Sequence, residues 1–246
     1  MEQTFALLDD TPAAHAGPVD GQPAAARSRR DIYAFIHKAL RAAMTDALLA
    51  VGRLDAADAR EVTATVVRVD ALLEFCGFHL DKENAYVHPA LEARAPGATR
   101  RIADEHRDHE AAIAGLRRKL DALARSPSAR RAGAAHELYL ALSVFVGENL
   151  LHMHEEETSH NATLWDCYSD SEIAAIEGRL KSQLTPAEMQ HAMRWMLPAL
   201  TPAERAAMLE EVREFAPVPV YEGLLAAARA HLDATAMRKL EASLAR

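Results

Sequence analysis

Cysteine, glycine and aromatic residues are scarce in this sequence of 246 residues. The only cysteines are Cys76 and Cys167, which excludes a disulfide framework and a cysteine-based zinc site. Aromatic residues make up 5% of the chain, and glycine occupies 10 positions. A β-sandwich depends on strands rich in β-branched and aromatic residues, so this composition disfavours one and suits packed helices.

Excess positive charge and long apolar runs are also missing. Lys and Arg total 28 against 36 Asp and Glu, a formal net charge of −8, so we expect no basic surface that binds nucleic acid or acidic lipid. No run approaches the ~18 apolar residues of a membrane span. Residues 1–21 are acidic and lack the basic start of an export signal. We therefore expect a cytoplasmic protein with no nucleic-acid partner and no membrane association.

The pattern along the chain divides it into three parts. Residues 1–28 are rich in Pro, Ala, Gly and Asp without any period, which indicates a mobile N-terminal arm. Helical periodicity then dominates, and short connections containing Gly or Pro separate four long segments. Such connections join antiparallel neighbours, so we predict an all-α, up-down four-helix bundle over residues 29–168. The four predicted helices span about 29–54, 58–94, 98–125 and 130–166.

The remaining residues, 170–246, have a different sequence pattern, with a repeated motif in place of long helical segments. Leu-Thr-Pro-Ala-Glu occurs at 184–188 and again at 200–204. In each copy Thr can cap a helix, Pro suits its first position and Glu completes a capping box. We therefore predict a C-terminal appendage of short helices, which is also a candidate surface for a protein partner or for self-association. The predicted helices lie near 185–197, 201–214, 220–231 and 233–245.

Histidine is the unusual residue, with 12 in the chain. When each long segment is drawn as a helix, the stripe that should face the core carries histidine on all four helices. On two helices a glutamate follows the histidine four residues later, on the same face. Burying this many polar groups is costly unless something satisfies them, and a metal does so. The metal-ligand candidates are His37, His79, Glu83, His106, His152 and Glu156.

The depth of these residues along the bundle supports one shared site. At a rise of ~1.5 Å per residue, positions counted from the turns agree to within about 3–6 Å. Four imidazoles and two carboxylates are too many ligands for one tetrahedral zinc, and they suit two metals bridged by the carboxylates. Without thiolates, iron or manganese fits the ligand set best. Open coordination positions would remain for a small molecule.

The combined pattern resembles the hemerythrin-like, or HHE cation-binding, domain family. It consists of His on the first helix, H-x-x-x-E on the second, E-H on the third and H-x-x-x-E-E on the fourth. The matching positions cover about residues 29–166, and Glu105 and Glu157 complete the pattern. The resemblance implies two iron ions bridged by Glu83 and Glu156, with manganese or zinc as alternatives. It further implies that His37 and His79 bind one iron and that His106 and His152 bind the other.

The resemblance also implies function, with one departure that matters. Oxygen-carrying hemerythrins have H-x-x-x-H on the third helix and H-x-x-x-x-D on the fourth, whereas this chain has Glu110 four residues after His106. One iron then lacks a histidine, or Glu110 or His109 replaces it. This favours a di-iron protein that senses, binds or processes oxygen, nitric oxide or iron over a simple oxygen carrier. A di-iron enzyme of oxidase, peroxidase or nitric oxide reductase type, and a metal-free helical interaction module, remain open alternatives.

Other residues near the stripe have simpler interpretations. His88 and Glu92 form another H-x-x-x-E, but His88 lies nine residues from His79, which places it on the opposite helix face at ~100° per residue. We expect a solvated or packing role for His154, and core packing for Cys76. His109 is a ligand, a hydrogen-bond donor to ligands, or simply packed. Asn149 is a candidate neighbour of the metal ligands. Tyr33 and Tyr86 are candidates to hydrogen-bond an oxygen species bound at the site. The histidines expected at the surface are His15, His136, His160, His191 and His231.

Overall fold

The computed structural model describes residues 29–245, and every regular element in that range is helical. The all-α class predicted from the sequence is therefore confirmed. The predicted arm, residues 1–28, lies outside the described residues. None of the described helices is long and apolar enough to cross a membrane.

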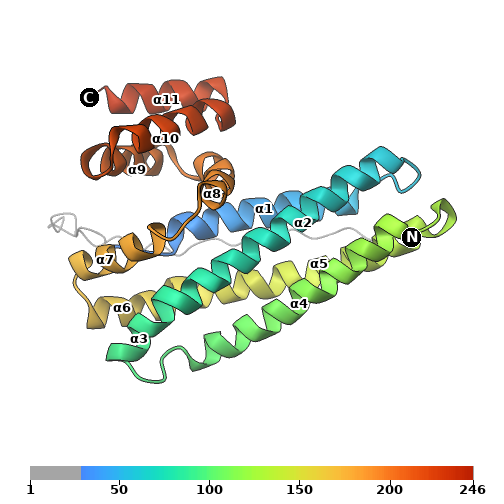
Figure 1. Cartoon of the computed structure of the whole chain (residues 1–246), viewed down its shortest axis with the longest axis horizontal. Helices are drawn as coiled ribbons and strands as arrows, with labels where there is room; N and C mark the ends of the chain where they lie inside the picture. Colours follow the sequence, from blue (N-terminus) through green and yellow to red (C-terminus); the bar gives the residue numbers. More distant parts are fainter. Residues whose placement is uncertain (1–28, 246) are drawn as a thin grey trace, which may run out of the picture.

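Four antiparallel rods form the main body of the molecule (Figure 1). Two of the rods are single helices, and two contain a π-helical turn between α-helical parts. The single helices are α1 (Ala34–Gly52) and α4 (Arg100–Arg125). The second rod consists of α2 (Ala59–Lys82), η1 (Glu83–Val87) and α3 (His88–Arg94). The fourth rod consists of α5 (Ser128–Glu155), η2 (Glu156–His160) and α6 (Asn161–Cys167).

Local sequence signals place the ends of these rods. Asp58 begins α2 by accepting hydrogen bonds from the backbone N–H groups of Arg60 and Glu61. The connection from α3 to α4 turns at Gly97, whose φ of 88° is in the left-handed region that favours glycine. The Glu92 carboxylate holds this connection, because it accepts hydrogen bonds from the N–H of Gly97 and from the N–H and hydroxyl of Thr99.

The predicted inward stripes largely form the core. On α4 every stripe residue is buried, from Ile102 through His106 and His109 to Leu123. The stripe of α5 is buried as well, from Leu138 to Asn149 and His152. The second rod departs from the prediction at its end, where Tyr86 is only half-buried and Val87 is buried in its place. The π-helical turn that precedes Val87 explains this change of face, because it adds a residue to the turn.

Five further helices follow the bundle. Their bounds are α7 (Asp170–Lys181), α8 (Pro186–Ala199), α9 (Pro202–Phe215), α10 (Val218–His231) and α11 (Ala234–Leu244). Both predicted capping boxes are present, Thr185 with Glu188 and Thr201 with Glu204. Helix α7 was not predicted from the sequence, although Ser169 and Glu172 form a third capping box that signals its start.

The C-terminal helices are not isolated from the bundle. Helix α8 packs on α1 (Figure 1), and Leu197 of α8 is fully buried. One continuous hydrophobic core joins residues of the four rods, such as Ala39 and Leu73, to Leu197, Leu209 and others in the C-terminal helices. Removing α8 would therefore expose apolar surface of α1 to water.

Candidate metal centre

The six residues predicted as metal ligands meet in the interior of the bundle, nearer the end formed by α3 and α6. They come from the start of α1, the junction of α2 with η1, the first third of α4 and the junction of α5 with η2. Their side chains are almost completely withdrawn from solvent, with exposed fractions between 0% and 8%. The structure thus brings together His37, His79, Glu83, His106, His152 and Glu156.

One group of donor atoms surrounds the histidines of the first two rods. The Nε2 atom of His37 lies 3.4 Å from Glu156 Oε2 and 3.8 Å from Glu83 Oε1. The Nε2 atom of His79 lies 3.2 Å from Glu83 Oε1. These four residues each offer a donor atom within 4.8 Å of the others, which is close enough to hold one cation after small side-chain movements.

A second group surrounds the histidines of the other two rods. His106 Nε2 lies 3.6 Å from Glu83 Oε2 and 3.6 Å from Glu156 Oε1, and His152 Nε2 lies 3.4 Å from Glu156 Oε2. The Nε2 atoms of His106 and His152 face each other at 3.1 Å. Both glutamates belong to both groups. Each carboxylate is therefore placed to bridge two cations.

The unpaired atoms of this cluster fit a pair of cations. Both carboxylate oxygens of Glu83 and of Glu156 are buried without a hydrogen-bond partner among residues 29–245, as are the Nε2 atoms of His37 and His79. Buried polar atoms without partners cost free energy, and buried carboxylates especially so. Two cations between these oxygens and nitrogens would satisfy all of them at once.

Polar neighbours fix the outward-facing nitrogens of three of the histidines. His37 Nδ1 lies 3.1 Å from Glu157 Oε1, and Arg41 holds the Glu157 carboxylate with two hydrogen bonds of 2.6 Å and 3.0 Å. His152 Nδ1 lies 2.9 Å from Glu105 Oε2, and His106 Nδ1 lies 2.8 Å from Asn84 Oδ1. Partners of this kind set the ring orientation of metal-binding histidines.

Two of these neighbours were not given a role by the sequence alone. Asn84 directly follows Glu83 in the first π-helical turn, and no spacing rule indicates an asparagine there. Arg41 lies one helical turn after His37, where an i, i+4 search around each predicted ligand would have found it. Glu105 and Glu157 were part of the E-H and E-E pairs in the sequence pattern, but their contacts with His152 and His37 emerge only from the fold.

Burial and neighbouring charges have opposing effects on the pKa values of several side chains in the cluster. Burial lowers the pKa of His152, but Glu156 and Glu105 outweigh it and raise this pKa to about 9. Burial and the nearby charge of His37 lower the pKa of His79. Burial raises the pKa of Glu156, yet the imidazoles of His106, His152 and His37 around the carboxylate lower it well below its usual range. The cluster without cations therefore holds protons that cations must displace on binding.

Two histidines contradict the sequence predictions. His88 was placed on the opposite helix face, but it is buried and its ring stacks on that of His106 with a centroid distance of 4.7 Å. His160 was expected at the surface, but it is also buried. A third group of close donor atoms combines these two residues with Glu156. The physical reason is the π-helical turn in each rod, which shifts the helix face: His88 directly follows η1, and His160 is the last residue of η2.

The sequence left the roles of several residues near the site undecided, and the structure shows which of them lie close to the cluster. Glu110 is exposed and does not join the cluster. The ring of His109 is buried against His152, with a centroid distance of 4.7 Å, but His109 belongs to none of the donor groups found in residues 29–245. Asn149 is buried and its side chain donates to the carbonyl of Phe145. Tyr33 is buried, and its hydroxyl lies 3.3 Å from His160 Nδ1.

The other histidines lie outside the centre. His136 and His154 are exposed, and His191 and His231 are half-buried. The fifth, His15, lies outside the described residues. Cys76 is buried, and burial raises the pKa of its thiol to about 12, so it packs as an unreactive apolar side chain.

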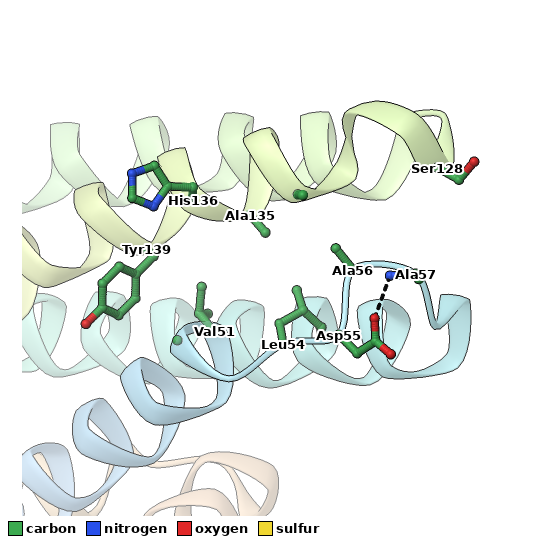
Figure 2. A pocket seen from close by; sticks show the side chains of 11 residues that line it. Val51, Leu54, Asp55, Ala56, Ala57, Ser128, Ala135, His136 and Tyr139 are labelled. Carbon is green, nitrogen blue, oxygen red and sulfur yellow. Dashed lines mark hydrogen bonds between the residues drawn. The ribbon is translucent and has the colours of Figure 1, made fainter.

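A cavity of about 680 Å³ lies at the opposite end of the bundle, where the loop after α1 meets the first turns of α5 (Figure 2). Its lining includes Val51, Leu54, Ala135 and Tyr139. Val51 follows His37 by fourteen residues on α1, a distance of about 21 Å along the helix. The cavity therefore contributes nothing to the His/Glu cluster.

The fold and the cluster together define a metal-binding helical protein, in which four rods direct buried imidazoles and carboxylates to one place. Comparison with protein families agrees with this class. The family model described as the hemerythrin HHE cation binding domain matches residues 30–160, and the chain belongs to this family. Comparisons with curated proteins and with solved structures gave no match.

Proposed function

We propose that this protein is a non-haem di-iron protein that binds, senses or handles oxygen, nitric oxide or iron. In this proposal His37 and His79 hold one iron, His106 and His152 hold the other, and Glu83 and Glu156 bridge them. The observation that carries the proposal is the sharing of both buried, unpaired carboxylates between two groups of histidines. A single cation would leave half of these donor atoms unsatisfied.

The ligand chemistry supports iron over the alternatives. Imidazole and carboxylate together suit iron, with manganese and zinc as the competing cations, and the site contains no thiolate. Iron bound there supplies redox chemistry and open coordination positions for a small diatomic ligand. The protein contributes the rest, since Glu157, Glu105 and Asn84 orient the imidazoles and the apolar core beneath them excludes water.

The absence of a further donor from α4 favours sensing or processing over simple oxygen carriage. Glu110 is exposed and His109 packs beside the cluster, so neither adds a ligand to the group that contains His106 and His152. A di-iron enzyme is the second candidate. The buried phenol of Tyr33 favours it, because its hydroxyl lies 3.3 Å from Nδ1 of His160 beside the cluster and can donate a hydrogen bond there.

Iron loading tests the main proposal. Purified protein reconstituted with ferrous iron under anaerobic conditions should retain two irons per chain and develop charge-transfer absorption on exposure to oxygen or nitric oxide. His79→Ala should lose at least one iron, whereas His154→Ala, which changes an exposed histidine of α5, should retain both. Fewer than two retained irons, or no charge-transfer absorption under any condition, would contradict the proposal. Steady turnover with a reductant, rather than stoichiometric binding, would identify the enzyme.

A further inference from the structure

His88 and His160 form a buried histidine pair beside the six residues assigned above. Their Nε2 atoms are inaccessible to solvent and have no hydrogen-bond partner within the described part of the chain. One donor atom of each lies within 4.8 Å of the other and of a Glu156 oxygen. We propose that His88 and His160, together with Glu156, form a third cation-binding position next to the metal pair.

A π-helical turn in each of the two rods places these histidines. Each bridging glutamate begins a π-helical turn, Glu83 in η1 and Glu156 in η2; His88 directly follows the first turn, and His160 is the last residue of the second. A π-helical turn contains one residue more than an α-helical turn, it is rare, and it occurs often at functional sites. In a regular α-helix His88 would lie opposite His79, outside the core. Two rods thus share an irregularity whose result is to turn an extra imidazole inward.

The surroundings leave the two rings free to act as ligands. When Nδ1 of His160 carries the ring proton, it can donate to the hydroxyl oxygen of Tyr33 at 3.3 Å, and Nε2 keeps its lone pair. The Oδ1 atom of Asn161, the residue after His160, is another buried acceptor without a partner among residues 29–245.

The donor set indicates which cations fit and how tightly. Two imidazole nitrogens and one carboxylate oxygen are the ligands of an open zinc-type site, and imidazole also suits ferrous iron and cobalt. Glu156 also serves the metal pair, so the third cation is repelled by its neighbours and binds more weakly. This inference rests on the proposed function only through that sharing of Glu156. The third position is consequently a candidate transient binding site for a cation that moves on to the buried metal pair.

A cobalt titration of the metal-free, full-length protein tests this position. Co²⁺ reports its binding through visible absorption, and imidazole-rich sites accept it. The wild-type protein should bind three equivalents, the third at least tenfold more weakly than the first two. His88→Phe keeps an aromatic ring against His106 but removes the ligand nitrogen, so it should bind two. His154→Phe, the matched control on the exposed face of α5, should bind three.

The outcomes separate this proposal from the proposed function. If wild type and His88→Phe both bind two equivalents, the third position does not exist while the di-metal centre stands. If His88→Phe still binds three, the assignment to His88 is wrong. If only one equivalent binds and His88→Phe abolishes it, the third position stands and the di-metal centre fails. Should His88→Phe not fold, anomalous scattering from cobalt-soaked wild-type crystals decides, because a peak between His88 and His160 is required.

Discussion

Glu156 shows at the scale of single residues how this centre is built. Its carboxylate is fully buried, yet neither oxygen has a hydrogen-bond donor within residues 29–245. The rings of His37, His106 and His152 approach it from three different rods. These imidazoles lower the pKa of Glu156 against the opposing effect of burial. The carboxylate therefore stays ionised, and the protons that a cation would displace are those that His37 and His152 hold, since the pKa of each of these rings is raised.

Glu157 holds the ring of His37 from outside the cluster. Its carboxylate joins His37 Nδ1 to Arg41, and His37 and Arg41 outweigh burial to lower the pKa of Glu157 to about 2. Glu157→Gln weakens this support, so we expect cation affinity to fall by about 10–100-fold, as is typical for residues that orient metal-binding histidines. Competition titration with a colorimetric chelator measures the effect.

Two further variants make this prediction specific. Glu148→Gln changes an exposed glutamate of the same rod, in α5, and should leave cation affinity unchanged. Glu157→Asp keeps the negative charge and should recover part of the lost affinity. Equal affinity in Glu157→Gln and wild type would show that the Glu157–His37 contact does not position the ring.

At the scale of elements, the π-helical turns explain what the heptad pattern missed. The pattern places residues correctly along α4 and up to Glu83 on the second rod, because those stretches are regular α-helices. After Glu83 the extra residue shifts the face, and Val87 and His88 become buried. No composition signal marks such a turn, and it forms because the tertiary contacts of the buried residues outweigh the lost α-helical geometry.

The connection between α3 and α4 yields a prediction about pH. Hydrogen bonds from Gly97 and Thr99 lower the pKa of Glu92 to about 2. Because the pKa is lower in the folded than in the unfolded state, the stabilisation is complete above about pH 4.5 and is lost as the pH falls toward 2. Glu92→Gln should therefore unfold at a lower temperature than wild type at pH 7, and the difference should shrink below pH 4.5.

Thermal unfolding of both proteins between pH 7 and pH 3 measures this effect. Glu110→Gln is the matched control, because Glu110 is exposed on α4. A difference between Glu92→Gln and wild type that stays constant with pH would show that the ionised carboxylate is not what holds the connection.

At the scale of the whole molecule, the C-terminal helices and the bundle share one core. Leu197 on α8 lies fully buried against α1, so Leu197→Ala should lower the free energy of unfolding by about 2–5 kcal/mol through lost burial and a cavity. Urea denaturation followed by circular dichroism should show a single transition at lower urea. Leu140→Ala, at an exposed position of α5, should change stability by no more than about 0.5 kcal/mol.

Removal of the cations should destabilise the whole fold. A cation at 100 times its dissociation constant adds about 2.7 kcal/mol of stability when it binds only the folded state. We therefore expect dialysis against a chelator to lower the melting temperature, and added ferrous iron to restore it. An unchanged melting temperature would favour the metal-free interaction module instead.

The sequence alone determined the four rods, the capping boxes of α8 and α9, and the six residues that converge at the centre. These follow from local rules, since apolar periodicity, capping boxes and His-x-x-x-Glu spacing act within one helix or across one turn. Only the tertiary structure decided that His88 and His160 turn inward, that Asn84 and Arg41 support the cluster, and that α8 shares the core of the bundle. These features depend on contacts between residues far apart in the chain, and local patterns carry no information about the packing energy that selects them.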